Sequence, residues 1–205
     1  MQNSRPSMSA RIFKRIFDIV FSLIVIVSIF SWLCPLLAIL IGLESKGPVF
    51  FIQLRTGKNG SLFKCYKFRS MRVNTHADER PATRNDERIT RVGAFLRKTS
   101  LDELPQFFNV LIGDMSIVGP RPHMVIHSDE FARVTYKYTL RHSLKPGITG
   151  WAQVNGLRGT IVSQEAILQR IDADVWYLEN WSFLLDLKII LRTFWVALKG
   201  DKNAW

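Results

Sequence analysis

The sequence predicts an α/β protein that is mainly helical, with one small β-hairpin and an N-terminal helix placed in the membrane. Three observations support this class. A long apolar run without charges lies near the N-terminus, two β-rich segments flank an Asn-Gly pair, and apolar residues recur with helical spacing further along. With 205 residues, the chain is long enough for one domain with a sizeable core. We expect a membrane anchor over residues 1–45 and the main folded domain over residues 46–205.

The uncharged run from Ile19 to Leu43 could cross a hydrocarbon core of roughly 30 Å as one straight helix. Pro35 lies inside it, and an internal proline removes a hydrogen bond and kinks a helix. Basic residues, which favour the cytoplasmic side, flank both ends of the run: Arg11, Lys14 and Arg15 before it, and Lys46, Arg55 and Lys58 after it. A Pro-kinked re-entrant helix fits this pattern best. A kinked single span and a buried helix of a soluble protein are the alternatives.

The β-hairpin is expected from Pro48 to Leu54 and from Leu62 to Phe68, both rich in β-branched and aromatic residues. The connection, Thr56 to Gly60, contains Asn59-Gly60, a pair that favours positive φ angles. Lysines fall on both faces of the second strand, because neighbouring residues of a strand point to opposite sides.

An arginine-rich segment follows the hairpin, and its part from Val73 to Asp86 is polar and predicted to be a loop. Guanidinium groups match phosphate oxygens as a bidentate fork, so one interpretation is a cradle for a diphosphate. The other is a soluble surface partly neutralised by nearby acids. The arginines are Arg69, Arg72, Arg80, Arg84, Arg88, Arg91 and Arg97.

A helix is predicted from Leu104, because Leu104, Phe107, Phe108, Leu111 and Ile112 have the spacing of one buried helical face. Asp102 and Glu103 open this helix, and Asp102, Gln106 and Asn109 project together from another side. A helix N-terminus keeps carboxylates ionised and attracts phosphate. Ser100-x-x-Glu103 also has the spacing of a capping box, so this stretch alone leaves capping and catalysis both open.

Two loops further along are candidates for substrate binding. In Gly119-Pro120-Arg121-Pro122, two prolines fix the backbone around an arginine, which suits anion recognition or a structural turn. The loop from Lys145 to Gly156 combines glycines with polar donors and a tryptophan. His123 and His127 have helical i, i+4 spacing, but no further ligand pattern accompanies them and zinc is not expected.

Two helices are predicted at the C-terminus, from Ser163 to about Leu178 and from Ser182 to Lys199, with Gly200 as the stop. The second is apolar, carries basic residues and lies in a tryptophan-rich region. An interfacial amphipathic helix on the bilayer fits these features, and a core helix of the domain is the alternative.

Charge and cysteine content limit the partners and the compartment. The formal net charge of +11 suits acidic partners such as anionic lipids, nucleotide diphosphates or nucleic acid. No nucleic-acid-binding module accompanies it, so a nucleic acid is not expected. The cysteines Cys34 and Cys65 have no disulfide or zinc spacing, which fits a reducing cytosolic face.

Six motifs occur in order across nearly the whole chain from about Lys14: KRIFDIVFS, SKGPVFF, FKCYKFRSM, LRKTSLDELPQFFNVLIGDMSIVGPRP, KPGITGWAQVNG and NWSFLLDLKIIL. This set resembles the bacterial sugar transferases, the monotopic polyprenyl-phosphate phosphoglycosyl transferases. The ending GWAQVNGLRG is similar to members that start exopolysaccharides with glucose or galactose phosphate. The chain resembles the catalytic part of larger relatives, which carry further membrane spans before it.

The resemblance implies an enzyme on the cytoplasmic face of the bacterial inner membrane, anchored by a re-entrant helix. Its substrates would be a UDP-sugar and undecaprenyl phosphate. Asp102 would attack the sugar-proximal phosphorus, UMP would leave, and the lipid phosphate would then take the phosphosugar. Glu103 would assist metal or proton handling, with Mg²⁺ held by Asp102 and Glu103. Lys67, Arg97, Arg121 and Gln106 are the substrate-binding candidates.

A different class of function remains open, namely a non-catalytic membrane-bound sensor of nucleotide sugars or an assembly factor. Such a protein would bind its ligand without Asp102 and would release no UMP. The intact Asp102-Glu103 pair argues against it. Homo-oligomer formation is left open by the sequence.

Overall fold

The structure is a computed structural model that describes residues 7–75, 77, 79, 82–83, 86–159 and 163–199. Arg80, Arg84 and Gly200 therefore lie outside the described residues. The helices are α1 (Met8–Val25), α2 (Ser31–Glu44), α3 (Arg91–Thr99), α4 (Gln106–Ile112), α5 (Val125–Val134), α6 (Lys137–Leu140), α7 (Trp151–Val154), α8 (Gln164–Glu179) and α9 (Phe183–Lys199). The strands are β1 (Phe50–Thr56), β2 (Leu62–Phe68), β3 (Ser116–Val118) and β4 (Gly147–Thr149). The mainly helical class is confirmed.

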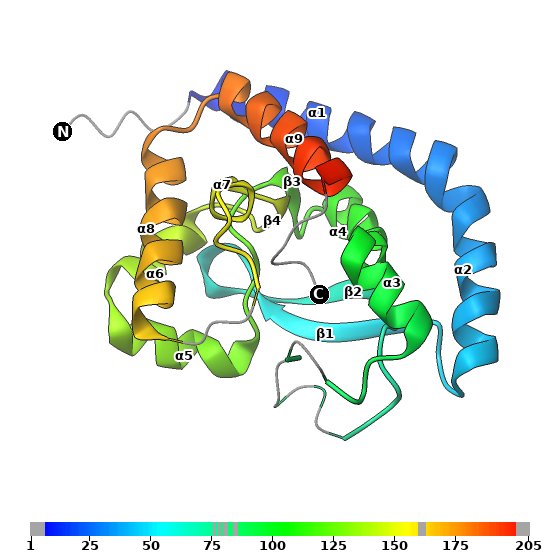
Figure 1. Cartoon of the computed structure of the whole chain (residues 1–205). Coiled ribbons are helices and arrows are strands. Elements are labelled where there is room, and N and C mark those ends of the chain that lie inside the picture. Colours follow the sequence, from blue (N-terminus) through cyan, green and yellow to red (C-terminus); the bar gives the residue numbers. More distant parts are fainter. Residues whose placement is uncertain are drawn as a thin grey trace.

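The N-terminal helix is continuous from Met8 to Glu44, and its length and composition would allow it to cross a membrane. It changes direction between α1 and α2 (Figure 1), where the five residues Ile26–Phe30 form a π-helical turn. There the N–H of Ser31 donates to the carbonyl of Ile26, one residue further back than in an α-helix. Bends commonly occur at such turns, and Pro35 follows within α2.

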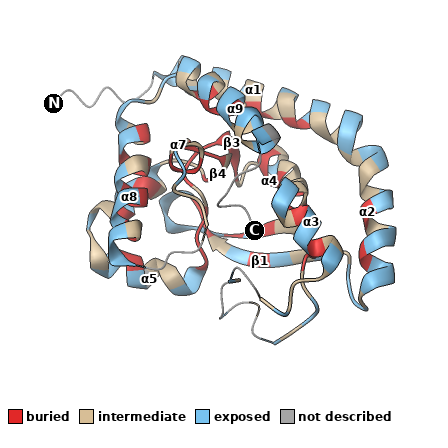
Figure 2. Ribbon diagram, viewed as in Figure 1, coloured by how far each residue is buried: buried red, intermediate tan, exposed pale blue. Residues whose placement is uncertain are grey.

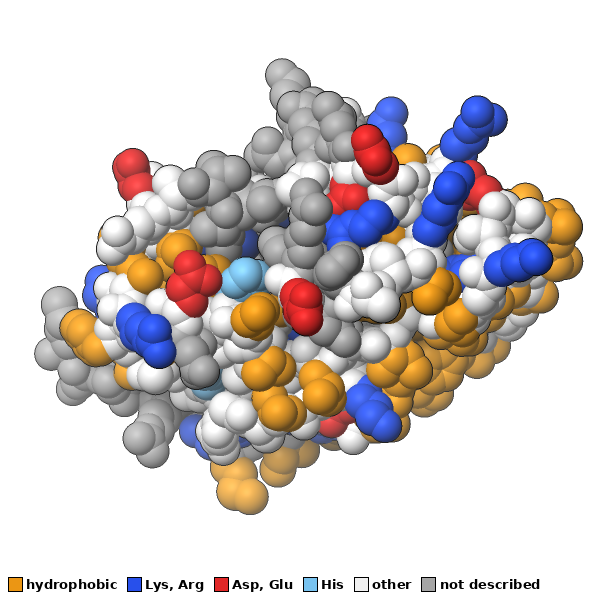
Figure 3. All heavy atoms as spheres, turned by 90° about the horizontal axis from the view of Figure 1, so that it is seen from below, with side chains coloured by type: hydrophobic (Ala, Val, Ile, Leu, Met, Phe, Trp, Pro, Cys, Tyr) orange, Lys and Arg blue, Asp and Glu red, His pale blue; other side chains and the backbone are white. Residues whose placement is uncertain are grey.

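Most of this helix faces away from the domain (Figure 2), and only 17% of its most apolar window is buried. Hydrophobic side chains form a band along the edge of the molecule where α2 lies (Figure 3). Exposed members of this band include Val27, Trp32, Leu36, Ile39 and Leu43. An unpartnered apolar surface of this kind fits the predicted anchor, while its re-entrant path stays a prediction.

The predicted hairpin is confirmed, with β1 antiparallel to β2 and Phe50 opposite Phe68. The first strand begins and ends two residues later than expected, at Phe50 and Thr56. Asn59 and Gly60 adopt φ angles of 54° and 76°, as the Asn-Gly pair predicted. The hairpin presents Lys67 toward the remaining elements of the candidate site.

A second, parallel pair of short strands, β3 and β4, was not predicted. Each has only three residues, and β4 lies within the Lys145–Gly156 segment that was expected to be a loop. Their backbones pack so closely that a Cβ on Gly147 would lie 2.1 Å from the nitrogen of Gly119. Only glycine allows this approach. The contact fixes the Gly119–Pro122 segment next to the start of the Lys145–Gly156 loop.

The prediction for the buried side of α4 was wrong in part. Gln106, Asn109 and Val110 are at most 2% exposed, whereas Ile112, expected inside, is 64% exposed. The reason is that the hairpin covers the polar side of α4. Asn109 accepts a hydrogen bond from the backbone N–H of Tyr66 at 3.0 Å and donates one to the carbonyl of Lys64 at 2.6 Å.

The aromatic side of α4 instead meets the N-terminal helix. Phe107 stacks with Phe21 of α1 at 6.3 Å between ring centroids, and Phe108 meets Phe30 edge to face at 5.0 Å. The helix that follows the two acids is therefore held between the hairpin and the apolar N-terminal helix.

Both C-terminal helices are confirmed, and α9 combines features of the two interpretations weighed for it. Ile189 is fully buried in the core, while Leu184 and Leu191 are 76% and 69% exposed. The exposed side is apolar enough to rest on a bilayer, and that placement stays a prediction.

Candidate active site

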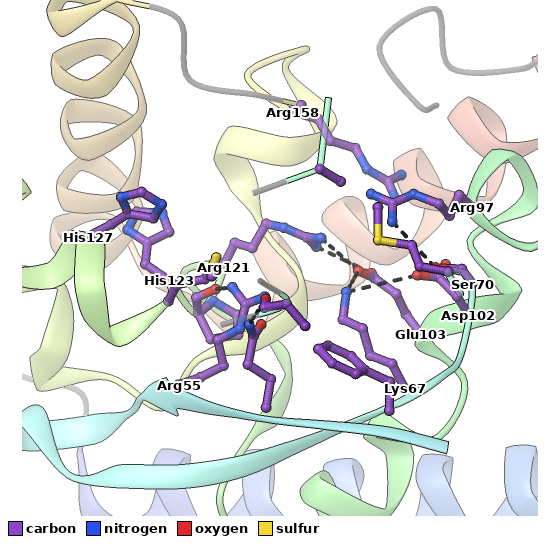
Figure 4. Close-up of a pocket in the computed structure, with 18 of the residues that line it drawn as sticks. Arg55, Lys67, Ser70, Arg97, Asp102, Glu103, Arg121, His123, His127 and Arg158 are labelled. Carbon is purple, nitrogen blue, oxygen red and sulfur yellow. Dashed lines mark hydrogen bonds and ion pairs between the residues drawn. The ribbon is translucent and has the colours of Figure 1, made fainter. Parts of the chain in front are cut away.

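A cavity with a volume of about 860 Å³ is lined by both acids of the Asp-Glu pair (Figure 4). Four separate parts of the chain bring charged groups to one end of it. Lys67 comes from β2, Arg97 from α3, the acids from the 3₁₀ turn Leu101–Glu103, and Arg121 from the segment after β3. Of the six predicted site residues, all except Gln106 therefore meet at this cavity.

Glu103 is held from two sides. The Nζ of Lys67 lies 2.7 Å from its Oε1, and the two terminal nitrogens of Arg121 lie 2.7 and 3.3 Å from Oε1 and Oε2. This is the bidentate geometry that an arginine forms with a carboxylate. The side chain of Glu103 is thereby fixed in one orientation.

Asp102 is placed differently. It is 7% exposed, and its ionic partner is Lys67, whose Nζ lies 4.0 Å from Oδ2. Within the described part of the chain, its carboxylate accepts no hydrogen bond. Asp102 is among the residues that line the cavity.

The capping-box interpretation is wrong. Ser100 adopts a left-handed conformation with φ 58°, and its side chain makes no capping hydrogen bond. Its Oγ instead accepts from Arg158 at 2.8 Å, while Glu103 binds Lys67 and Arg121 rather than the backbone of Ser100. The left-handed residue ends α3 and turns both acids toward the cavity.

The two neighbouring acids have pKa values shifted in opposite directions. Burial raises the pKa of Asp102, and the charge of Glu103 adds to this increase against the opposing effect of Lys67. Burial also acts on Glu103, but Arg121 and Lys67 outweigh it and hold the pKa of Glu103 well below its usual range. Glu103 is therefore firmly ionised, whereas Asp102 is an acid whose charge is costly until a cation approaches.

Several arginines of the arginine-rich segment line the cavity, and the contacts that they make differ. Arg69 donates to the carbonyls of Ser45 and Lys46 at 2.6 and 2.5 Å and so secures the end of the anchor. Arg88 pairs with Asp86 at 2.6 Å. Arg97 lines the cavity, lies 3.4 Å from Ser70 Oγ, and has its pKa lowered by burial.

Gln106 is not brought to this cavity. It is 2% exposed and is not among the residues that line the cavity, so its predicted role in binding stays a prediction. Sequence reasoning missed Arg158 and His123, which do line it. Arg158 lies two residues after the glycine-rich loop and has no distinctive spacing of its own. His123 directly follows the rigid Pro-Arg-Pro segment, and its i, i+4 spacing to His127 points only toward a metal site, which was not expected.

The donors present fit Mg²⁺ as a partner of a diphosphate. Among the described residues, no group of three or more His, Cys, Asp or Glu side chains could hold a metal ion alone. Mg²⁺, however, is usually bound by one or two carboxylates together with phosphate oxygens and water. Asp102 and Glu103 supply two carboxylates at the cavity wall.

Comparison with known proteins extends this picture. Residues 9–200 match the family model described as bacterial sugar transferase. The chain is 50% identical over 193 residues to the UDP-glucose:undecaprenyl-phosphate glucose-1-phosphate transferase of Klebsiella pneumoniae, covering 94% of this chain and 41% of that protein. It is 45% identical over 201 residues to the enzyme of the same name from Caulobacter vibrioides, covering 98% and 74% of the two chains.

A shorter relative aligns over almost its whole length. This is the exopolysaccharide production protein PSS of Rhizobium leguminosarum bv. phaseoli, 43% identical over 197 residues, with 94% of this chain and 98% of the relative covered. The Klebsiella and Escherichia coli relatives are longer, and the chain spans 41% of the length of each.

Proposed function

The chain belongs to the bacterial sugar transferase family, and from this premise we propose that it transfers a sugar 1-phosphate from a UDP-sugar to undecaprenyl phosphate. The relatives named for glucose 1-phosphate transfer support glucose as the sugar, with galactose as the alternative. The relative named for exopolysaccharide production supports a role at the start of glycan assembly.

The reaction that we propose has two displacements at one phosphorus. A carboxylate oxygen of Asp102 forms a bond to the sugar-proximal phosphorus, and the bond from that phosphorus to the bridging oxygen breaks, so UMP leaves with the electron pair. A phosphate oxygen of undecaprenyl phosphate then attacks the same phosphorus. The acyl phosphate bond breaks, Asp102 regains its carboxylate, and the product is an undecaprenyl diphosphate sugar.

The observation that carries this assignment is the contrast between the two acids. Glu103 is occupied by Lys67 and Arg121 at 2.7 Å each, whereas Asp102 lies in the same cavity without a hydrogen bond from any described residue. A nucleophile needs a free lone pair directed into the space where substrate binds. Asp102 meets this requirement better than Glu103 does.

Positive groups around the acids suit a diphosphate, since phosphoryl transfer depends on positioning and charge neutralisation. Arg97, Arg121 and Lys67 line the cavity near Asp102 and would bind phosphate oxygens. Asp102 and Glu103 would hold Mg²⁺ together with the diphosphate. When bound, the ion would neutralise negative charge on the phosphates.

The anchor would bring the lipid substrate to this site from the membrane. We propose that the bent helix over α1 and α2 enters and leaves the bacterial inner membrane on the cytoplasmic face. The bend at the π-helical turn and the basic residues on both flanks support this path over a single span.

The test is UMP release by the purified protein with Mg²⁺, undecaprenyl phosphate and a panel of UDP-sugars. Asp102→Asn should abolish release, because an amide cannot form the acyl phosphate, while nucleotide binding is kept. Asp172→Asn is the matched control, since Asp172 is an exposed acid that pairs with Lys137 away from the cavity. Absence of release with every sugar, with equal nucleotide binding by wild type and Asp102→Asn, would instead support the sensor.

A further inference from the structure

His123 lies at the side of the cavity opposite Asp102, with Arg121 between them (Figure 4). His123 is only 7% exposed, yet it is one of the residues that line the cavity. The ring is fixed by aromatic neighbours. It stacks on Tyr138 with 5.8 Å between the ring centroids, and it meets the Phe131 ring edge to face with 5.1 Å between the centroids.

Arg141 determines which ring nitrogen of His123 carries the proton. A terminal nitrogen of Arg141 lies 3.1 Å from Nδ1, and a guanidinium can only donate, so Nδ1 must accept. Arg141 is itself held by Asp174 at 2.9 and 2.8 Å and donates to the carbonyl of Arg121 at 2.6 Å. The neutral ring therefore carries its proton on Nε2.

This Nε2–H group is buried and has no hydrogen-bond partner within the part of the chain that the structure describes. Buried polar hydrogens are almost always paired in folded proteins. Burial and the positive charge of Arg141 hold the pKa of His123 well below its usual range, so the ring stays neutral. A neutral donor suits an uncharged acceptor and would be a weak partner for a phosphate compared with the arginines around it.

The direction of the proposed reaction, on which this inference rests, indicates which part of the substrate reaches His123. In phosphoryl transfer, the attacking and leaving oxygens lie roughly in line on opposite sides of phosphorus. With Asp102 attacking, UMP lies on the side of the phosphorus away from Asp102. The cavity continues in that direction past Arg121 to His123.

We propose that the Nε2–H of His123 donates a hydrogen bond to an uncharged acceptor oxygen of the nucleoside half of the UDP-sugar. The acceptors available there are the base carbonyl oxygens and the ribose hydroxyls. His123 is then a specificity residue for the nucleoside, and Arg141 with Asp174 positions it by fixing its tautomer.

Two substitutions test the two ring nitrogens of His123 one at a time. His123→Asn places an amide oxygen near the position of Nδ1, where it accepts from Arg141, but leaves nothing at the position of Nε2. His123→Gln places its amide near Nε2 and leaves Arg141 without that acceptor. His142→Asn is the matched control, because its Nε2 is also buried and unpartnered among the described residues but His142 does not line the cavity.

The measurement is UMP binding to the full chain in detergent by titration calorimetry, with thermal unfolding of each variant. His123→Asn should remain folded and bind UMP about tenfold more weakly, the loss expected for one hydrogen bond of about 1.4 kcal/mol. His123→Gln should retain more of the UMP affinity despite a lower unfolding midpoint, and His142→Asn should bind as the wild type does.

Three results would overturn the proposal. If folded His123→Asn binds UMP as tightly as the wild type, Nε2 makes no contact with the nucleotide. If this variant loses affinity for UDP-glucose but not for UMP, the contact is with the sugar. If the wild type binds neither UMP nor UDP-glucose, the proposed function fails together with the inference. The first two results overturn the inference alone, because UMP release by the wild type would be unaffected.

Discussion

At the scale of single residues, two adjacent carboxylates of the site differ in pKa because their surroundings differ. Glu103 is ionised because Arg121 and Lys67 contact it directly, and Asp102 has its pKa raised by burial. Pairs of acids with pKa values moved apart commonly divide the work of catalysis. Here Glu103 is fixed by its two cationic partners, while Asp102, the proposed nucleophile, accepts no hydrogen bond within the described part of the chain.

Glu103→Gln should move the acid limb of the pH profile of UMP release to lower pH. Asp102 must be ionised to attack, so release by the wild type rises as the pH increases through the raised pKa of Asp102. The charge of Glu103 contributes to that increase in pKa, and removing it lets Asp102 ionise at lower pH. The measurement is kcat/KM for the UDP-sugar as a function of pH, using the residual activity of the variant. An acid limb that stays in place or moves upward would contradict the assignment.

At the scale of elements, α3 carries Arg97 and is capped both by the residue directly before it and by an acid from a distant helix. Thr90 accepts from the N–H of Gly93 at 2.9 Å, and the carboxylate of Glu44 at the end of α2 accepts from the N–H groups of Arg91 and Val92 at 2.6 and 2.8 Å. Such acceptors satisfy the free N–H groups of a helix start. The anchor therefore helps to place the helix that supplies Arg97.

Gly93→Ala should displace α3 and destabilise the protein by about 2 kcal/mol or more. A Cβ at this position would lie 1.9 Å from the backbone oxygen of Ser70, which cannot move without disturbing the cavity. Gly42→Ala is the control, because this exposed helical glycine has no atom within 4 Å of an added Cβ. In detergent, Gly93→Ala should have a lower thermal unfolding midpoint and slower UMP release than the wild type, whereas Gly42→Ala should change neither. Equal unfolding midpoints for the two variants would show that α3 is not packed as described.

At the scale of the whole molecule, polar groups connect α1 to the domain. The carboxylate of Asp186 in α9, 1% exposed, accepts from Lys14 at 2.5 Å and from the hydroxyl of Tyr177 at 2.6 Å. The side chain of Arg15 donates to the carbonyls of Val110 and Leu111 at the end of α4, at 2.6 and 2.8 Å. The first half of the anchor is therefore built into the domain that carries the site.

Asp186→Asn should lower the free energy of unfolding by roughly 3 kcal/mol, because it leaves the ammonium of Lys14 without its buried partner. Lys188→Gln removes an exposed charge from the same helix and should change stability little. Unfolding by denaturant in detergent micelles compares the two. Similar losses in both variants would mean that the pair does not join α1 to the domain.

A re-entrant anchor should leave both of its ends on the cytoplasmic face. In a Cys34→Ala background, Ser9→Cys and Ser45→Cys mark the two ends of the helix, and the remaining Cys65 is buried. A membrane-impermeant maleimide added to intact spheroplasts should label neither position and should label both after permeabilisation. Labelling of one position in intact spheroplasts would establish a single span.

The sequence by itself determined the helical class, the hairpin with its positive φ angles, the apolar N-terminal helix and the residues of the Asp-Glu, Lys67, Arg97 and Arg121 set. These follow from local spacing, from turn preferences and from motifs kept in order. Only the tertiary structure showed that Glu103 is the acid held by cationic groups, because its partners Lys67 and Arg121 lie 36 and 18 residues away along the chain. It likewise decided that the polar side of α4 is buried and that Nε2 of His123 carries the proton, since both depend on partners from distant elements that no local pattern records.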